Sequence, residues 1–222
     1  MEKYTVVLAD IIGSRKLNDY ERHEWQLFLK SAIVQVNENF SRFIEASFMI
    51  TKGDEFQGVL KSISSVHQIM MEFERLIFPL TLRFAVGHGA IQKMGSKIPI
   101  EMDGQAFHRA QAALNIAKKK KLSVVINTEN DDFNRMINTV YQLMYAIKSR
   151  WSDVNFKRYW KYQEIGTYER VAQDEGVSTQ AVWDSLHHSN AIDIIQAELT
   201  LGQILCEENV LSRFTPMHDS NG

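Results

Sequence analysis

The sequence predicts an α+β protein, in which a split βαβ, ferredoxin-like domain precedes an all-α region that contains a helix-turn-helix. Three observations predict this fold class. Apolar runs rich in β-branched residues alternate with helical periodicity, in the order β-α-β-β-α-β-α-β. No strand pattern returns after Asn127. Amphipathic helical segments then continue to about residue 213. We therefore expect an antiparallel-rich sheet with helices on one face, followed by a group of helices.

Composition narrows the classes of function. The chain has 222 residues, with 25 Lys and Arg against 27 Asp and Glu, for a formal net charge of -2. This balance excludes a globally basic nucleic-acid binder, because neutralising phosphates requires an excess of Lys and Arg, but a local basic patch stays open. The single Cys206 excludes a disulfide framework and a cysteine-based zinc site. The apolar run at residues 6–12 is short and contains Asp10, so we expect no membrane segment and a cytoplasmic location.

The first part of the chain predicts a strand, a long helix and a hairpin. The apolar run at residues 4–12 is typical of a strand buried on both faces. Residues 47–52 and 55–60 predict two strands joined at Gly53 and Asp54, because such a pair favours a two-residue turn. The long helix between the first strand and this hairpin carries one apolar stripe at steps of three and four. Its members are Trp25, Phe28, Leu29, Ala32, Ile33, Val36, Phe40 and Phe43.

The remaining elements complete the domain. We expect a helix, a strand, an alanine-rich helix and a strand at residues 66–77, 80–90, 104–119 and 122–126. Gly87 and Gly89, near the end of the second of these elements, allow another backbone to approach closely. The expected limits are 1–127 for this domain, 128–150 for a connecting helix, 151–213 for the helical region and 214–222 for a flexible tail.

Two acidic residues are candidates for a metal site. Asp10 lies inside an apolar strand, where a charge is costly unless it is paired or liganded, and Asp54 lies at a hairpin tip. In a split βαβ sheet the first strand lies beside the hairpin, so the two carboxylates can converge. Such oxygens suit Mg²⁺ or Mn²⁺, with the carbonyl of Ile11 and the carboxylate of Glu55 as further donors. The alternative is that both aspartates only stabilise local turns.

Four motifs in order resemble known nucleotide-handling domains. Residues 9–14 (ADIIGS) resemble the first metal motif of class III nucleotidyl cyclases, and residues 52–56 (KGDEF) resemble their second and the GGDEF tip of diguanylate cyclases. Residues 82–89 (LRFAVGHG) and 104–112 (GQAFHRAQA) are similar to a cyclase strand and the helix after it. Over the whole chain the sequence is identified as a member of the bacterial SatD family, which joins such a domain to a helical part.

The resemblance implies a cyclase-like palm with a metal site at Asp10, Asp54 and Ile11, and a site for a purine nucleotide. Its expected nucleotide-binding residues are Ser14, Arg15, Lys52, Gly53, Glu55 and His108. The basic run at residues 118–121 has two interpretations, a favourable charge against a helix dipole or a phosphate contact.

The departures from the cyclase pattern concern catalysis. Cyclases place an Asn and an Arg on the last helix, where this chain has His108 and Ala112, and Ile50 stands where a lysine would contact the purine. Losing a charged donor to the transition state costs on the order of 10²–10³ in rate. The resemblance therefore implies the fold and a metal–nucleotide site, and does not imply turnover.

Residues 171–186 resemble a helix-turn-helix. Gly176 permits the turn and Ser178 can cap the second helix, whereas Glu175 stands at a position that is usually apolar. The expected small core consists of Val171, Val177, Val182 and Leu186. The expected contacts to DNA or to a protein partner are Ser178, Thr179, Gln180, Trp183 and His187. Residues 151–190 have 4 Lys and Arg against 6 Asp and Glu, so counterion release cannot supply their affinity for DNA.

These observations favour a regulatory protein, in which a nucleotide- and Mg²⁺-binding palm is coupled to a helix-turn-helix that contacts DNA or a partner. One alternative is an active nucleotidyl cyclase, a phosphorus–oxygen lyase, with altered catalytic residues. Another is a structural adaptor in which the acidic pair is vestigial. A homodimer is expected through the last helix, although packing of its apolar residues within the chain is an equal alternative. These residues are Ile192, Ile195, Leu199 and Leu205.

Overall fold

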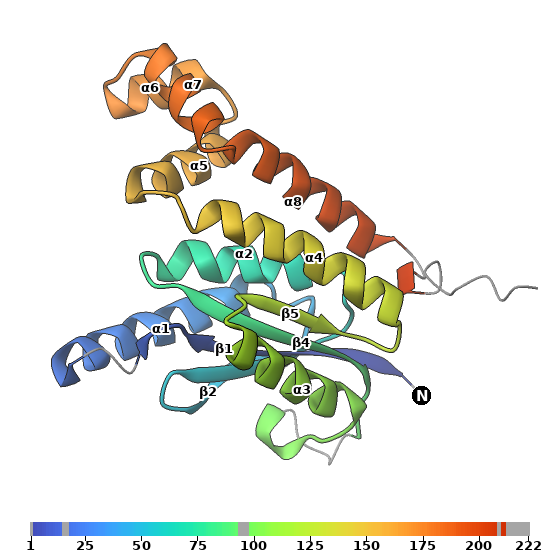
Figure 1. The fold of residues 1–222 in the computed structure, drawn as a ribbon. Coiled ribbons are helices and arrows are strands. Elements are labelled where there is room, and N and C mark those ends of the chain that lie inside the picture. Colours follow the sequence, from blue (N-terminus) through green and yellow to red (C-terminus); the bar gives the residue numbers. More distant parts are fainter. Residues whose placement is uncertain (1, 15–17, 93–97, 208–209, 212–222) are drawn as a thin grey trace, which may run out of the picture. The chain divides into compact units, whose positions relative to one another are not determined.

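The computed structural model describes residues 2–14, 18–92, 98–207 and 210–211 (Figure 1). The chain divides into two compact units. The palm unit comprises Met1–Gln142 with Ile204–Gly222, and the helical unit comprises Leu143–Gln203. Two helices, α4 (Asp131–Lys148) and α8 (Ala191–Cys206), contain residues of both units. The domain limits given above stay a prediction. Among the described residues, no helix combines the length and the apolar character needed to cross a membrane.

A five-stranded sheet forms the centre of the palm unit. Its strands are β1 (Lys3–Ile11), β2 (Ile44–Lys52), β3 (Glu55–Leu60), β4 (Leu82–Ala90) and β5 (Val124–Asn127). Their order across the sheet is β2-β3-β1-β4-β5. The central strand β1 is antiparallel to both β3 and β4, and β5 is parallel to β4. This confirms the α+β class and the split βαβ layout, in which β3 lies between the parallel pair β1 and β2.

Helices cover both faces of this sheet. On one face, Phe73 of α2 (Val66–Ile77) packs against Phe48, Phe56 and Phe84. The helix α1 (Asp19–Asn39) packs on α2 and β2. On the opposite face, α3 (Gln105–Lys120) packs its buried alanines against β1, β4 and β5 (Figure 1). The expectation that all helices lie on one face was therefore wrong. The reason is that β1 and β4 are apolar on both sides, so each side needs a cover.

Gly87 sets how closely α3 approaches β4. A Cβ atom at this position would lie 2.1 Å from the carbonyl oxygen of Ala106 and 2.3 Å from the amide nitrogen of Ala110. Only glycine permits this approach, since both colliding atoms belong to the backbone. The sequence prediction of a close backbone contact here is confirmed, and the contact fixes α3 along the sheet. A short 3₁₀ helix, η2 (Pro99–Glu101), precedes α3.

The helical unit contains α5 (Asp153–Ile165), α6 (Tyr168–Glu175) and α7 (Thr179–His188), and the last two form the predicted helix-turn-helix. Gly176 takes the left-handed conformation at φ 67°, and the hydroxyl of Ser178 accepts a hydrogen bond from the amide of Ala181 at 3.1 Å. Val171, Val182 and Leu186 are fully buried as expected. Val177 is 40% exposed, so its place in the small core was wrong. Ala172 is buried instead.

Glu175 stands at a usually apolar position because it has a cationic partner. Its carboxylate lies 2.7 Å from Nη2 and 2.8 Å from Nε of Arg158, which comes from α5. Both side chains are largely buried, so the pair replaces an apolar contact between α5 and α6.

Candidate functional site

Acidic side chains from two elements converge at one end of β1. Asp10 is the second-last residue of β1, and Asp54 lies in the turn between β2 and β3. Pairing of β1 with β3 brings this turn to the end of β1. The Oδ2 atom of Asp54 accepts a hydrogen bond from the amide of Ile11, the residue after Asp10, at 3.3 Å. We call Asp10, Asp54 and the neighbouring Glu55 the acid edge.

Two cationic side chains face the acid edge. Asp10 is only 5% exposed, and Arg83 lies directly opposite it on β4. Nη1 of Arg83 donates to both carboxylate oxygens of Asp10, at 2.8 and 2.9 Å. Nζ of Lys118, in the last turn of α3, lies 3.2 Å from Asp10 Oδ2 and 2.6 Å from Glu55 Oε1. Asp10 therefore faces two positive charges, which compensate its buried charge, and Glu55 shares one of them.

The ion pairs also affect Lys118. Burial alone would lower the pKa of its ammonium group, but the hydrogen bonds to Glu55 and Asp10 outweigh burial, so the pKa is raised. Lys118 is therefore charged at neutral pH and holds its place between the two carboxylates.

The acid edge offers oxygen donors of the kind that a divalent cation takes. Among the described residues, no group of three or more His, Cys, Asp or Glu side chains is arranged to hold a metal ion. Mg²⁺ commonly takes one or two protein carboxylates and completes its shell with phosphate and water. Asp10 and Asp54 therefore match the number and the type of ligands that Mg²⁺ takes from a protein. Lys118 contacts Asp10 and Glu55 and so occupies part of the space beside Asp10, but its side chain is 41% exposed and can turn away. The residues present therefore fit one ion.

The other residues predicted for the nucleotide are spread more widely. Lys52 and Gly53 lie at the hairpin tip beside Asp54, with Gly53 at φ 62°. Ser14 is in the turn that follows β1, and Arg15 lies outside the described residues. His108 lies ten positions before Lys118 on α3, about 15 Å along the helix, and its Nε2 atom is 3.0 Å from Asp103 Oδ1. The structure thus does not bring His108 to the acid edge.

A hollow of about 360 Å³ lies on the same face of the sheet as the acid edge. Leu8 precedes Asp10 by two residues and Gln57 follows Glu55 by two, so all four side chains point to the face that α3 covers. Each step of two residues spans about 7 Å. The other lining residues are Pro99, Ile100, Met102, Asp103, Phe107, His108 and Gln111. Apolar walls with amide groups, one such step along the strands from Asp10 and Glu55, suit a planar base that carries phosphates.

The sequence interpretation assigned no role to Arg83 and left Lys118 within a run of four lysines. The signal that identifies Arg83 is strand register, because a buried Asp on a central strand needs a partner directly opposite or on the helix above it. The signal for Lys118 is weaker, because the sequence does not show which of the four lysines faces the acid edge. The three lysines that follow Lys118 are exposed, and only the packing of α3 on the sheet distinguishes Lys118 from them.

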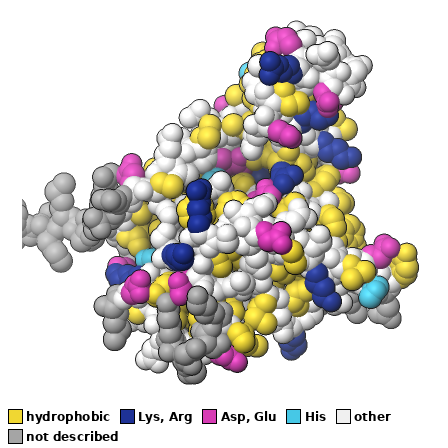
Figure 2. All heavy atoms as spheres, turned by 180° about the vertical axis from the view of Figure 1, so that it is seen from behind, with side chains coloured by type: hydrophobic (Ala, Val, Ile, Leu, Met, Phe, Trp, Pro, Cys, Tyr) yellow, Lys and Arg dark blue, Asp and Glu magenta, His cyan; other side chains and the backbone are white. Residues whose placement is uncertain are grey.

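The predicted contact residues of the helix-turn-helix are all exposed. Trp183 stacks on His187 with ring centroids 4.0 Å apart, and His187 lies 3.2 Å from the hydroxyl of Tyr168. Gln180 donates to Asp184 at 2.9 Å, while the Ser178 hydroxyl already serves as the helix cap. Thr179 is the first residue of α7. On the face drawn in Figure 2, acidic and basic side chains are interspersed and do not form one basic patch.

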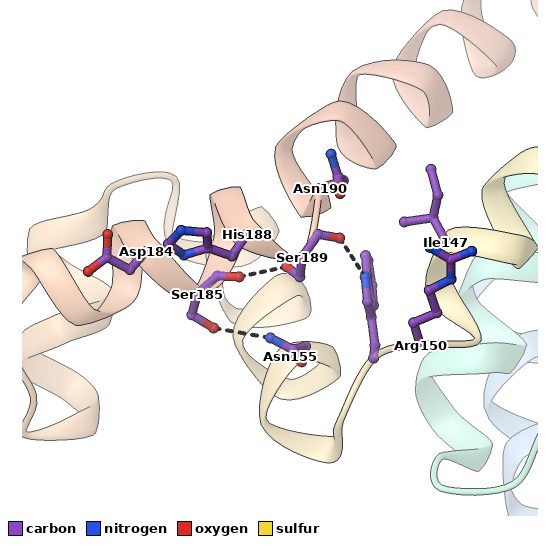
Figure 3. Close-up of a pocket in the computed structure, with 9 residues that line it drawn as sticks. Ile147, Arg150, Asn155, Asp184, Ser185, His188, Ser189 and Asn190 are labelled. Atoms are coloured by element: carbon purple, nitrogen blue, oxygen red, sulfur yellow. Dashed lines mark hydrogen bonds between the residues drawn. The ribbon is translucent and has the colours of Figure 1, made fainter.

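A second hollow, of about 370 Å³, lies within the helical unit (Figure 3). Its walls are fixed by side-chain hydrogen bonds: Trp151 Nε1 donates to the carbonyl of Ser189 at 2.7 Å, and Asn155 Nδ2 donates to Ser185 Oγ at 3.2 Å. The remaining lining residues are Ile147, Arg150, Asp184, His188 and Asn190. Most of the lining residues are polar, with groups of both signs beside the apolar Ile147 and Trp151, so the hollow suits a small molecule that has polar and apolar parts.

Comparison with solved structures gives distant likenesses. One is a bacterial light-regulated adenylyl cyclase, with 16% identity and a TM-score of 0.38 over 56% of this chain and 74% of that chain. Another is a regulator of polyketide synthase expression from Bifidobacterium adolescentis, with 11% identity and a TM-score of 0.26 over 93% of this chain and 88% of that chain. No curated protein matches the sequence. The model of the SatD family matches residues 4–197. Because that match spans most of the chain, the protein belongs to the SatD family.

Proposed function

We propose that this SatD-family protein is a regulator whose palm unit binds a purine nucleotide together with a divalent cation, and whose helix-turn-helix passes the ligand state to DNA or to a protein partner. The observation that carries the proposal is the hydrogen bond between Asp54 and the amide of Ile11. It holds a second carboxylate beside Asp10, on a different element, and two such carboxylates are what Mg²⁺ takes from a protein when phosphates complete its shell.

The nucleotide part of the proposal is supported by the surroundings of the acid edge. Arg83 and Lys118 provide positive charge for phosphate oxygens. The hollow lined by Leu8, Gln57 and Phe107 offers apolar contact and an amide for a base on the same face. When bound, the ion neutralises phosphate charge; the chain's own groups orient the ligand and exclude water around it.

Binding without turnover is the form that these residues favour. Ala112 is exposed and has no group to stabilise a transition state, and His108 is engaged with Asp103. Incubation of the pure protein with ATP or GTP and Mg²⁺ or Mn²⁺ is expected to give no cyclic nucleotide. Formation of cyclic product above a heat-treated control would establish the active-cyclase alternative.

One observation favours the alternative of a structural adaptor. Both oxygens of Asp10 already accept hydrogen bonds from Arg83, so the acid edge is partly neutralised by the chain itself. On that account the acids stabilise the sheet and bind no ligand. The two accounts differ in whether a nucleotide with a metal ion stabilises the protein.

Thermal unfolding with Mg²⁺ and ATP or GTP tests the proposal. A ligand at 100 times its Kd adds about 2.7 kcal/mol, which raises Tm by about 5–10 °C for a chain of this size. We expect this shift for the wild type and for Asp131→Asn, which removes an acid on α4. We expect most of the shift to be lost in Asp54→Asn. An equal shift in Asp54→Asn, or none in the wild type, would contradict nucleotide binding at the acid edge.

The output of the helical unit is tested separately. A gel shift with mixed-sequence DNA at several salt concentrations, with and without nucleotide, is compared between wild type and Gln180→Ala. If α7 contacts bases, the variant binds more weakly by about 1–3 kcal/mol. If neither protein binds DNA in any of these conditions, the result contradicts DNA contact, and a protein partner is the remaining form of the proposal.

A further inference from the structure

We propose that Lys118 is a tethered cation that holds the place of the divalent ion at the acid edge, and that an ion binds there only by displacing it. This inference rests on the proposed function and assigns a role to a residue that the motifs leave out. It concerns binding of the ion itself and does not depend on turnover.

The position of the ammonium group carries the inference. Nζ of Lys118 bridges Asp10 Oδ2 at 3.2 Å and Glu55 Oε1 at 2.6 Å, one carboxylate from β1 and one from the hairpin. A bridging cation between carboxylates of two elements is also the arrangement that a divalent ion adopts. The two cations therefore compete for the same carboxylate of Asp10.

Lys118, and not Arg83, is the group that can leave. The side chain of Arg83 is 14% exposed, and its partner Asp10 lies opposite it in the strand register. Moving Arg83 away would leave the buried carboxylate of Asp10 without this cationic partner. The side chain of Lys118 is 41% exposed and lies in the last turn of α3. Its ammonium can reach water by rotating about the bonds of a flexible four-carbon stem.

The exchange has a consequence for selectivity. With Lys118 in place, the acid edge is compact and nearly neutral in the absence of metal. Replacing the ammonium group with a monovalent ion leaves the total charge at the acid edge unchanged. Replacing it with a divalent ion adds one unit of positive charge beside three carboxylates. The tethered lysine therefore selects against monovalent cations and lowers the affinity for divalent ions.

Isothermal titration with Mn²⁺ alone tests the inference in three full-length proteins. Lys118→Met keeps the length of the side chain and removes its charge. Lys119→Met makes the same change on an exposed neighbour in the same turn and is the matched control. We expect Lys118→Met to bind Mn²⁺ about tenfold more tightly than wild type, because one competing charge is gone. We expect Lys119→Met to bind like wild type.

The outcomes separate this inference from the proposed function. Equal, measurable Mn²⁺ affinity in wild type and Lys118→Met overturns the role of Lys118 and leaves the metal site standing. Tighter binding in both Met variants also overturns it, since general surface charge then explains the gain. Absence of Mn²⁺ binding in all three proteins overturns the inference, because the ion alone then has no site here; the proposed function, in which phosphates complete the shell, is tested by the thermal shift with nucleotide. Lys118→Gln, checked for folding by circular dichroism, repeats the test with a polar side chain.

Discussion

Asp10 shows how a single buried charge organises its surroundings. A carboxylate that is 5% exposed on a central strand is tolerated because Arg83 and Lys118 both reach it. The compensation is incomplete, since the Nε atom of Arg83 is buried and has no hydrogen-bond partner within the described part of the chain. A polar group left in this state costs free energy and is a candidate for contact with a further ligand or water.

Replacing Arg83 tests this view of Asp10. Arg83→Met leaves a buried carboxylate with Lys118 as its remaining cationic partner, so we expect the free energy of unfolding to fall by about 3 kcal/mol. Arg75→Met is the control, because Arg75 pairs with Glu72 on the surface of α2 and such pairs contribute under about 1 kcal/mol. Urea unfolding followed by circular dichroism measures both. Equal costs in the two variants would show that Asp10 does not depend on Arg83.

At the scale of elements, the packing of α3 on β4 positions the acid edge. Lys118 reaches Asp10 only because α3 lies close to the sheet along its whole length, and Gly87 and the small alanines of α3 allow this approach. A bulkier residue in this contact would lift the helix and withdraw Lys118 from the carboxylates.

Gly87→Ala is therefore expected to lower the stability of the palm unit by about 1–3 kcal/mol, the range typical of overpacking. The added methyl would collide with backbone atoms of Ala106 and Ala110, so shortening a side chain on α3 cannot relieve it. Urea unfolding of Gly87→Ala and of the double variant with Ala110→Gly measures this. Recovery of wild-type stability in the double variant would contradict a backbone collision.

At the scale of the whole molecule, periodicity predicted most elements, and topology predicted the meeting of Asp10 and Asp54. The helix predicted at residues 66–77 is α2, and its residues Val66, Ile69, Met70, Phe73 and Ile77, at steps typical of one helix face, are all fully buried. The first strand was predicted to be buried on both faces, but periodicity does not indicate which helix covers which face, so the cover on the second face was missed. Arg83 and Lys118 were missed because the partner of a buried charge depends on strand register and on the rotation of α3, which local patterns do not encode.

The stability of the palm unit is expected to depend on pH through His88. Burial, and then the charge of nearby Lys3, lowers the pKa of its imidazole from 6.5 to about 4, and its Nδ1 atom lies 3.0 Å from the hydroxyl of Thr5. The unfolded chain therefore binds a proton between pH 6.5 and 4 that the folded chain does not. Stability falls as pH falls through this window, by about 3 kcal/mol in all.

Urea unfolding at pH values from 4 to 8 measures this dependence, with His88→Gln as the comparison. The difference in free energy of unfolding between the two proteins is expected to be constant above pH 7 and to shrink steadily below pH 6.5. Parallel curves for the two proteins over the whole range would exclude His88 as the source.

The central claim is that Asp10 and Asp54 share a divalent ion that holds the phosphates of a nucleotide. Crystals soaked with Mn²⁺ and a non-hydrolysable purine triphosphate test it most directly, because Mn²⁺ is located by its anomalous scattering. The account predicts a peak about 2.1 Å from oxygens of both carboxylates, with phosphate density beside it and Lys118 turned away from Asp10. An acid edge without a peak, with Lys118 still bridging Asp10 and Glu55 in the presence of saturating ligand, would contradict it.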